Sequence, residues 1–243
     1  NDIVYFISLK DSIPNIIKLC GKNNFKIKDV MIIGGSRIGI NTAELLENDF
    51  RVTLVEKDKV TCQQMANTLK ETLIINIDGH DVKMLEEEGL TEIDALISVT
   101  ADSEMNIMTS LVGKSHGIKK TIARIENFDY INLSQSIGID TLINKKIIAA
   151  DNIFKFVRKG NVSLVANLHG TDAEIIEFVV KDGSKITKSP INKLNFPNSS
   201  KIAGVIRNGI PIIPFGDFHL KENDKTIVFS LTESIQKIEK FFQ

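Results

Sequence analysis

The sequence predicts an α/β protein, with a Rossmann-like doubly wound parallel sheet followed by a small α+β module. Three observations lead to this prediction. Between residues 28 and 143, short apolar runs alternate with segments of helical length, which is typical of βαβ units. A glycine-rich turn follows the first apolar run, as in sheets that bind dinucleotides. After residue 160 the pattern changes to short apolar runs separated by Pro, Asn and Gly, which is typical of hairpins.

The first unit can be assigned element by element. Val30–Ile33 is apolar throughout, as expected of a central parallel strand buried on both faces. Further strands are expected at 51–55, 73–77, 93–99, 121–125 and 141–143. Helices are expected between them at 38–47, 59–70, 81–88 and 103–116. Asp81 is a suitable N-cap for the third of these helices, and the connections between parallel strands should be right-handed.

The second module is expected to begin after a connector helix at 144–160. Its strands are expected at 162–168, 174–180, 201–207, 210–213 and 226–230, before a terminal helix at 235–242. Asn208 and Gly209 separate two apolar runs. Asn-Gly is the strongest short hairpin signal, because both central residues of a type I′ turn need positive φ. The predicted domains are therefore a nucleotide-binding domain at 28–143, the connector, and a C-terminal module at 161–243.

Composition excludes several classes of protein. The chain has 243 residues, and its 30 Lys and Arg nearly cancel its 31 Asp and Glu, which argues against a general nucleic-acid-binding protein. No apolar run approaches the roughly 18 residues that span a bilayer, so direct membrane insertion is not expected, and no signal peptide is recognisable. The two cysteines, Cys20 and Cys62, do not form a disulfide framework and fit a reducing, cytoplasmic setting.

Residues 1–20 resemble residues 223–242 at a constant offset of 222. Eight of the twenty positions are identical without a gap, and both segments are expected to form a strand, an acidic turn and a helix. Self-similarity at a fixed period indicates a repeated architecture, and the alternative is chance similarity between two short segments. We therefore expect residues 1–23 to be the last strand and helix of a preceding C-terminal module, in a piece of a longer tandem protein.

The glycine turn is the main candidate for a binding site. The stretch Gly34–Gly39 reads Gly-Gly-Ser-Arg-Ile-Gly, which matches G-x-G-x-x-G except at Ser36. In that motif the first glycine makes the turn, the second lets a pyrophosphate approach, and the third packs the helix on the sheet. The helix N-terminus offers N–H groups to an anion. The Ser36 side chain could donate to a phosphate or crowd it, and the alternative is a turn kept for packing alone.

Further candidates lie after the later strands. Glu56 follows the second strand, 22 residues after Gly34, where an acidic side chain accepts from a ribose hydroxyl and favours a ribose without a 2′-phosphate. Because open α/β sheets bind ligands at the carboxyl ends of their strands, other candidates are Asp78, Gly79, His80, Asp81, Thr100, Asp102 and Arg124. Asp78 has an alternative as a turn residue and Asp81 as a helix cap. Arg37 projects from the turn and could pair with a phosphate in its own or a neighbouring subunit, or be an ordinary surface residue.

The sequence contains no recognisable catalytic or metal-binding constellation. The four histidines, His80, His116, His169 and His219, have no metal-ligand spacing. A CxxC pair, a P-loop lysine, a nucleophile elbow and an HExxH motif are all missing. No base for hydride transfer is evident. An NAD-dependent oxidoreductase and a ligand-free structural module therefore stand as alternatives to a nucleotide-binding regulator.

Over essentially its whole length, the sequence resembles the TrkA family, the cytosolic regulators of bacterial potassium uptake built from RCK units. The resemblance rests on VMIIGGSRIG, VTLVEKD, IDGHD, DALISVTADSEMNIM, IARIEN, GIDTLINKKIIAADNIFKFVRKGNV and VIRNGIPIIPFGDFHLKENDKTIVF. Members typically carry two tandem units. This chain therefore resembles the C-terminal half, a second TrkA_N plus TrkA_C unit with the tail of the first.

The resemblance implies a non-enzymatic regulator that binds NAD(H) or an adenine nucleotide (ATP or ADP) and gates a membrane potassium channel or transporter. Its units would form homo-oligomers, from dimers to rings, on the cytoplasmic side of the inner membrane, attached through the partner protein. Lys57 would touch ribose or adenine. The complete set of candidate cofactor-binding residues is Gly34, Gly35, Ser36, Arg37, Ile38, Gly39, Glu56, Lys57, Asp78, Gly79, His80, Thr100, Asp102 and Arg124.

Overall fold

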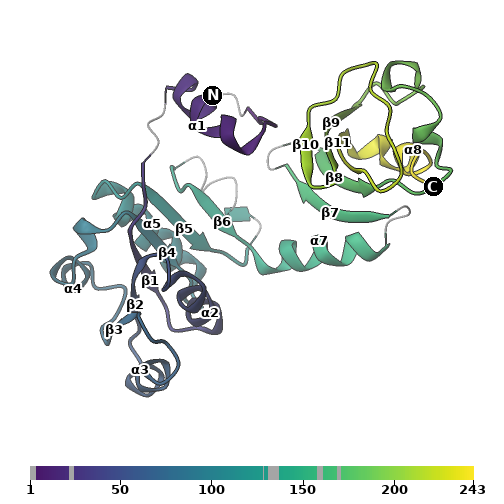
Figure 1. Ribbon diagram of the computed structural model, residues 1–243. Coiled ribbons are helices and arrows are strands. Elements are labelled where there is room, and N and C mark those ends of the chain that lie inside the picture. The colour runs from purple at the N-terminus through teal and green to yellow at the C-terminus, as the bar shows by residue number, and fades with distance from the viewer. Residues whose placement is uncertain (1–3, 22–24, 128, 131–136, 158–160, 169–170) are drawn as a thin grey trace. The chain divides into compact units, whose positions relative to one another are not determined.

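The computed structural model describes residues 4–21, 25–127, 129–130, 137–157, 161–168 and 171–243 (Figure 1). The chain divides into two compact units, one formed by Phe25–Lys146 and the other by Asn1–Asn24 together with Ile147–Gln243. The described residues contain one parallel and one antiparallel sheet. The predicted fold class, a Rossmann-like sheet followed by a small α+β module, is therefore confirmed.

The first unit is built on a six-stranded sheet in the order β3-β2-β1-β4-β5-β6. All of its pairings are parallel. The strands are β1 (Asp29–Ile33), β2 (Arg51–Val55), β3 (Leu73–Ile75), β4 (Ala95–Ser98), β5 (Lys120–Arg124) and β6 (Thr141–Ile143). This is the Rossmann strand order, and the chain changes direction across the sheet between β1 and β4. The carboxyl ends of these two strands therefore flank the topological switch point.

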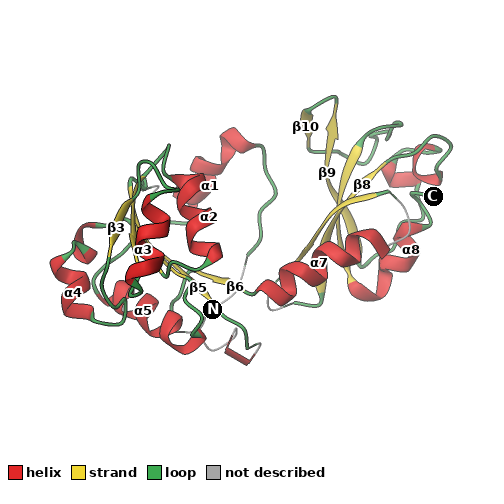
Figure 2. Ribbon diagram, turned by 90° about the horizontal axis from the view of Figure 1, so that it is seen from below, coloured by secondary structure: helices red, strands yellow, loops and turns green. Residues whose placement is uncertain are grey.

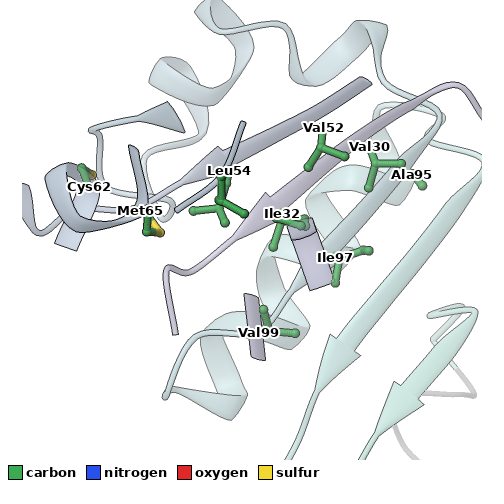
Figure 3. Close-up of a cluster of buried hydrophobic side chains, with 11 residues drawn as sticks. Val30, Ile32, Val52, Leu54, Cys62, Met65, Ala95, Ile97 and Val99 are labelled. Carbon is green, nitrogen blue, oxygen red and sulfur yellow. The ribbon is translucent and has the colours of Figure 1, made fainter. Parts of the chain in front are cut away.

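Helices cover both faces of the parallel sheet, and in Figure 2 they surround its strands. They are α2 (Arg37–Leu46), α3 (Lys59–Ala66), α4 (Val82–Glu87) and α5 (Ser103–Ser115), with a short 3₁₀ turn η2 (Leu90–Glu92). Val30 and Ile32 of β1 face a cluster that contains Cys62 and Met65 of α3 (Figure 3). Met31 and Ile33 face the opposite cluster, with Leu85 of α4 and Val112 of α5. The alternation of side chains along β1 thus supplies two cores from one strand.

Two helices end clearly before their predicted ends. The terminal helix expected over 235–242 ends at Glu239. The helix expected over 59–70 ends at Ala66. The N–H groups of Asn67 and Thr68 bond to carbonyls three residues back, on Gln64 and Met65, which tightens the last turn and ends the α-helix.

The second unit contains a five-stranded antiparallel sheet in the order β10-β9-β11-β8-β7. The chain enters it through α7 (Lys145–Val157). Its strands and helical turns are β7 (Val162–Asn167), β8 (Ala173–Val179), η3 (Lys185–Thr187), η4 (Ile191–Lys193), β9 (Ser200–Arg207), β10 (Ile210–Ile212), β11 (Lys225–Leu231), η5 (Thr232–Ser234) and α8 (Ile235–Glu239). Asn208 and Gly209 have φ of 53° and 79°, so the predicted hairpin turn is confirmed. In the core, Phe178 and Phe242 stack with ring centroids 4.2 Å apart.

The start of the chain repeats the backbone conformation of its end. The turn η1 (Lys10–Ser12) and helix α1 (Ile13–Leu19) lie 222 residues before η5 and α8. Leu9 has φ −64° and ψ 145°, and Leu231 has φ −69° and ψ 144°. Residues 4–9, however, form no strand, contrary to the expectation from sequence. A strand needs a hydrogen-bonded neighbour, and β11 has two in β8 and β9.

Among the described residues, no helix is both long and apolar enough to cross a bilayer.

Candidate functional site

A cavity of about 360 Å³ opens where β1, β2 and β4 end, at the topological switch point of the parallel sheet. Its position agrees with the rule that open α/β sheets bind ligands at the carboxyl ends of their strands. The lining residues are Ile33, Gly34, Gly35, Ser36, Val55, Glu56, Lys57, Thr61, Asp78, Gly79, His80, Thr100, Ala101 and Asp102. The cavity thus brings together ten of the fourteen candidates.

The glycine turn is tight because neighbouring groups approach its backbone closely. Gly34 has φ +110°, and a Cβ there would lie 3.0 Å from the backbone N of Thr100. A Cβ on Gly35 would lie 2.9 Å from Cγ of Glu56. A Cβ on Gly39 would lie 2.0 Å from the carbonyl oxygen of Gly34. The first two glycines therefore leave the turn bare, and the third allows α2 to pack directly against it.

Ser36 lines the cavity, and its hydroxyl is hydrogen-bonded within the protein. Its hydroxyl donates to the carbonyl of Val99 at 3.0 Å and accepts from the N–H of Gly39 at 3.3 Å. Ser36 is therefore the N-cap of α2. The N–H groups of Arg37 and Ile38, also in the first turn, have no acceptor within the helix. The anion-binding capacity of the turn consequently lies in its backbone.

Glu56 is held in place by two backbone groups. Its Oε2 accepts from the N–H of Gly35 at 2.7 Å, and its Oε1 accepts from the N–H of Asp58 at 2.8 Å. Each carboxylate oxygen has a second lone pair. The side chain can therefore accept hydroxyl groups of a ligand without losing either bond. Lys57 also lines the cavity and is exposed.

The loop after β3 forms another part of the wall. Oδ1 of Asp78 accepts from the N–H of His80 at 3.0 Å and lies 3.1 Å from His80 Nδ1. A Cβ on Gly79 would lie 2.3 Å from Cγ2 of Ile33, so this residue must be small. Asp81 caps α4 by accepting from the N–H groups of Lys83 and Met84 and does not line the cavity. Asp81 is therefore a helix cap, as one of its two interpretations predicted.

The loop after β4 supplies Thr100 and Asp102. Thr100 donates its N–H and its hydroxyl to Oδ1 of Asn106, at 2.9 and 2.7 Å. Asp102 is the N-cap of α5 and accepts from the N–H of Met105 at 3.0 Å, although it also lines the cavity. Both residues are positioned by the start of α5, which fixes this side of the cavity.

Four candidates do not line the cavity. Arg37 is exposed on α2, while Ile38 and Gly39 pack on the protein side of that helix. The Arg124 side chain is only 8% exposed and donates from Nη1 to the carbonyl of Thr100 at 2.9 Å. Its charge is turned toward Glu126, whose pKa is lowered by the hydrogen bond and charge of Arg124. Arg124 therefore lies behind Thr100, which forms the cavity wall.

Sequence reasoning missed two polar contributors. Thr61 lines the cavity and bonds through its N–H and hydroxyl to Asp58, the N-cap of α3. Its position three residues after a capping Asp was the available signal. Asn106 lies behind Thr100 and is 1% exposed. A buried amide inside a helix has no sequence signature apart from its polarity on an apolar face.

The buried cysteine and the histidines of the described part of the chain do not gather at the cavity, except for His80. Cys62 is buried in the core, and burial raises the pKa of its thiol, which disfavours the reactive thiolate. No cluster of metal-ligating side chains occurs in the described part of the chain, and His169 lies outside it. The cavity can instead offer backbone N–H donors at the turn and a fixed carboxylate beside them.

The sheet order, the glycine turn and the acidic residue after β2 define a protein of the Rossmann-like class with an appended antiparallel module. Comparison with known proteins gives the family. Residues 30–145 match the TrkA-N domain, and residues 175–243 match the TrkA-C domain. The chain belongs to the TrkA family.

Relatives align with the entire chain. The Trk system potassium uptake protein TrkA homolog 1 of Methanosarcina mazei is 30% identical over 245 residues, covering 100% of this chain and 55% of the relative. The TrkA protein of Haemophilus influenzae is 32% identical over 246 residues, covering 100% of this chain and 54% of the relative. The chain thus spans about half the length of these relatives. Among solved structures, the GsuK channel bound to NAD has a TM-score of 0.56 at 14% identity, covering 95% of this chain and 43% of the channel chain.

Proposed function

We propose that this chain is a non-enzymatic, nucleotide-binding regulatory part of a membrane potassium-uptake system. The observation that carries the nucleotide part is the placement of Glu56 beside the glycine turn. The Glu56 carboxylate, which has free lone pairs, lies beside the backbone of Gly34 and Gly35 and beside the N-terminus of α2. Ribose hydroxyls and phosphates need these two kinds of partner close together.

The proposed ligand is NAD(H) or an adenine nucleotide, ATP or ADP. Its phosphates would lie at the turn formed by Gly34, Gly35 and Ser36 and at the start of α2, and a ribose would lie at Glu56. Lys57 would touch ribose or adenine, with Asp78, Gly79, His80, Thr100 and Asp102 along the adenosine side. Arg37 would reach a phosphate from outside the cavity. A solved protein of this fold is described as bound to NAD, which supports the ligand class.

The proposed partner is a membrane potassium channel or transporter subunit. The names of the relatives support it, because they describe potassium uptake proteins of the Trk system. The chain would act in the cytoplasm, attached to the inner membrane through that partner, as a homo-oligomer from dimer to ring. Regulation requires that the nucleotide bind one conformation of the assembly better than another. A difference of a few kcal/mol is sufficient.

The proposed domain boundaries are 28–143 for the nucleotide-binding domain, 144–160 for the connector and 161–243 for the C-terminal module. Residues 1–23 are proposed to be the tail of a preceding C-terminal module, the counterpart in sequence of β11, η5 and α8, although residues 4–9 form no strand here. The supporting observation is the repeated backbone conformation at Leu9 and Leu231, where each copy enters its turn and helix.

Isothermal titration with NADH, ATP and ADP tests the nucleotide proposal. We expect saturable binding of at least one of them to the wild type. Glu56→Ala should weaken that binding at least tenfold and reduce any preference for NADH over NADPH, because the carboxylate repels a 2′-phosphate. Glu44→Ala, an exposed residue of α2, is the matched control for charge. Absence of binding heat with all three nucleotides would overturn the proposal and favour a structural module.

Absorbance at 340 nm tests the non-enzymatic part. NADH incubated with the protein and a panel of small oxo acids and aldehydes should keep its absorbance. Steady turnover of NADH that depends on one of these substrates would instead identify an oxidoreductase.

A further inference from the structure

Asn106 of α5 joins the wall of the cavity to the interior of the sheet. It is 1% exposed. Its Oδ1 accepts from the hydroxyl of Ser98 at 3.1 Å and from two groups of Thr100. Its Nδ2 donates to the carbonyls of Thr100 at 3.1 Å and Arg124 at 2.9 Å. One buried amide thus binds the ends of β4 and β5 together.

Thr100 connects this hydrogen-bond network to the glycine turn. Its backbone lies so close to Gly34 that a Cβ there would be 3.0 Å from the Thr100 nitrogen. Its carbonyl accepts from both Asn106 and Arg124. A ligand that displaces Thr100 must therefore disturb Arg124 as well.

Arg124 connects this wall to the start of α7. Its Nη2 pairs with Oε1 of Glu126, and the same carboxylate oxygen lies 3.7 Å from Nζ of Lys145, the first residue of α7. The carbonyl of Glu126 also accepts from Nδ2 of Asn144 at 3.3 Å, and Oδ1 of Asn144 accepts from the N–H of Lys146 at 2.9 Å. All of these residues lie within the first compact unit.

The guanidinium of Arg124 has little freedom to find other partners. Among the described residues, its buried Nε has no hydrogen-bond partner, and its hydrogen bonds to Thr100 and Glu126 are made by Nη1 and Nη2. A buried charge that loses one partner is strongly destabilised, and a planar guanidinium binds two acceptors in a fixed geometry. A shift of Thr100 should therefore be passed to Glu126 rather than absorbed.

We propose that Asn106, Arg124 and Glu126 are positioning residues that couple the Thr100 wall of the cavity to the first turn of α7. The link between nucleotide occupancy and α7 rests on the proposed function, whereas the mechanical link between Thr100 and α7 does not. Coupling of this kind is reciprocal. A well-ordered first turn of α7 should stabilise the observed position of Thr100. A nucleotide in the cavity should in turn stabilise the first turn of α7.

Hydrogen exchange of the full chain without nucleotide tests the mechanical link. Glu126→Ala should accelerate exchange at least fivefold both at the Thr100 amide and in residues 146–150. Glu126→Gln keeps an acceptor for Arg124 and should restore most of the protection. Glu104→Ala removes an exposed carboxylate from α5 and should leave both segments unchanged. Melting temperatures of the variants control for global unfolding. Faster exchange at 146–150 with an unchanged Thr100 amide would overturn the coupling.

Hydrogen exchange with saturating NAD⁺ or ADP tests whether nucleotide binding affects α7. In the wild type, nucleotide should slow exchange at Thr100 and at 146–150. In Glu126→Ala it should still slow Thr100 but lose at least two thirds of its effect on 146–150. Equal protection of α7 in both proteins would contradict the proposal. A further outcome is that neither nucleotide binds while Glu126→Ala without nucleotide still accelerates exchange at both Thr100 and 146–150. That result would reject the proposed ligands and support the mechanical coupling.

Discussion

In the unit Phe25–Lys146, polar side chains gather around an open cavity. In the C-terminal module, a buried ion pair instead holds two segments of the chain together. Arg207 of β9 donates to both carboxylate oxygens of Asp224 at 2.8 and 2.7 Å. Asp224 is 1% exposed, and the guanidinium also lies 4.8 Å above the ring of Phe218. This ion pair fastens the β9–β10 hairpin to the segment that precedes β11.

The difference follows from strand direction. Parallel strands end at the same edge of the sheet, so the loops after β1, β2, β3 and β4 place their polar groups around one cavity. Antiparallel strands send successive loops to opposite edges of the sheet, so the loops of the C-terminal module are divided between two edges. The cavity at the switch point therefore follows from the topology of the parallel sheet, whereas the C-terminal module packs an aromatic and aliphatic core.

Removal of an aromatic ring from the C-terminal core should have the largest effect on stability. Phe242→Ala deletes one ring of the Phe178–Phe242 stack and should cost about 3–5 kcal/mol of unfolding free energy. Urea denaturation measures this loss. Phe215→Ala, which truncates a ring that is 77% exposed, is the control. A parallel tenfold loss of nucleotide affinity in Phe242→Ala would contradict the division between the units.

Gly39→Ala should damage the glycine turn. Its Cβ would meet the carbonyl oxygen of Gly34 at 2.0 Å, so α2 must shift, at a cost of about 1–3 kcal/mol. Nucleotide binding should fall at least tenfold, as measured by titration. Gly89→Ala introduces a side chain at φ +91° into open space and therefore reports backbone strain without the clash. If both variants bind nucleotide equally well, the turn is not the phosphate site.

Acid should weaken the first unit through Asp94. Its carboxylate is bonded to Lys119 and to the N–H groups of Lys28 and Asp29, which lower its pKa to about 2. A depressed folded pKa adds stability above the unfolded value of 3.8, and this stability is lost as pH falls through the folded value. Between about pH 4 and pH 2 the wild type should lose more stability than Asp94→Asn. Identical acid titration curves would contradict this role.

The smallest effect should come from His116 at the end of α5. Its Nδ1 lies 2.8 Å from the carbonyl of Val112 and its Nε2 lies 2.7 Å from Glu86. The bond to Val112 and the pairing with Glu86 raise its pKa above 6.5. A raised folded pKa adds stability below 6.5 that disappears as pH rises through the folded value. The stability difference between wild type and His116→Gln should therefore be larger at pH 5.5 than at pH 8.5.

Local signals in the sequence predicted much of this molecule. Asp81 as a helix cap, Asn208 and Gly209 as a hairpin turn, and the strand at 141–143 all depend on nearby residues. Features that depend on tertiary context could not be found in the same way. The Ser36 hydroxyl turns to Val99 and Gly39, and Arg124 lies behind Thr100 instead of lining the cavity. Residues 4–9 have strand-like composition but form no strand, because pairing requires a neighbour that composition does not specify.

A crystal structure of the chain with NAD⁺ at saturating concentration would show directly whether the cavity at the switch point binds a nucleotide. We expect electron density for the nucleotide in the cavity, with a ribose hydroxyl within hydrogen-bond distance of Glu56 and phosphate oxygens at the N–H groups of the turn and the start of α2. Density for the nucleotide elsewhere on the molecule, with this cavity empty, would contradict it.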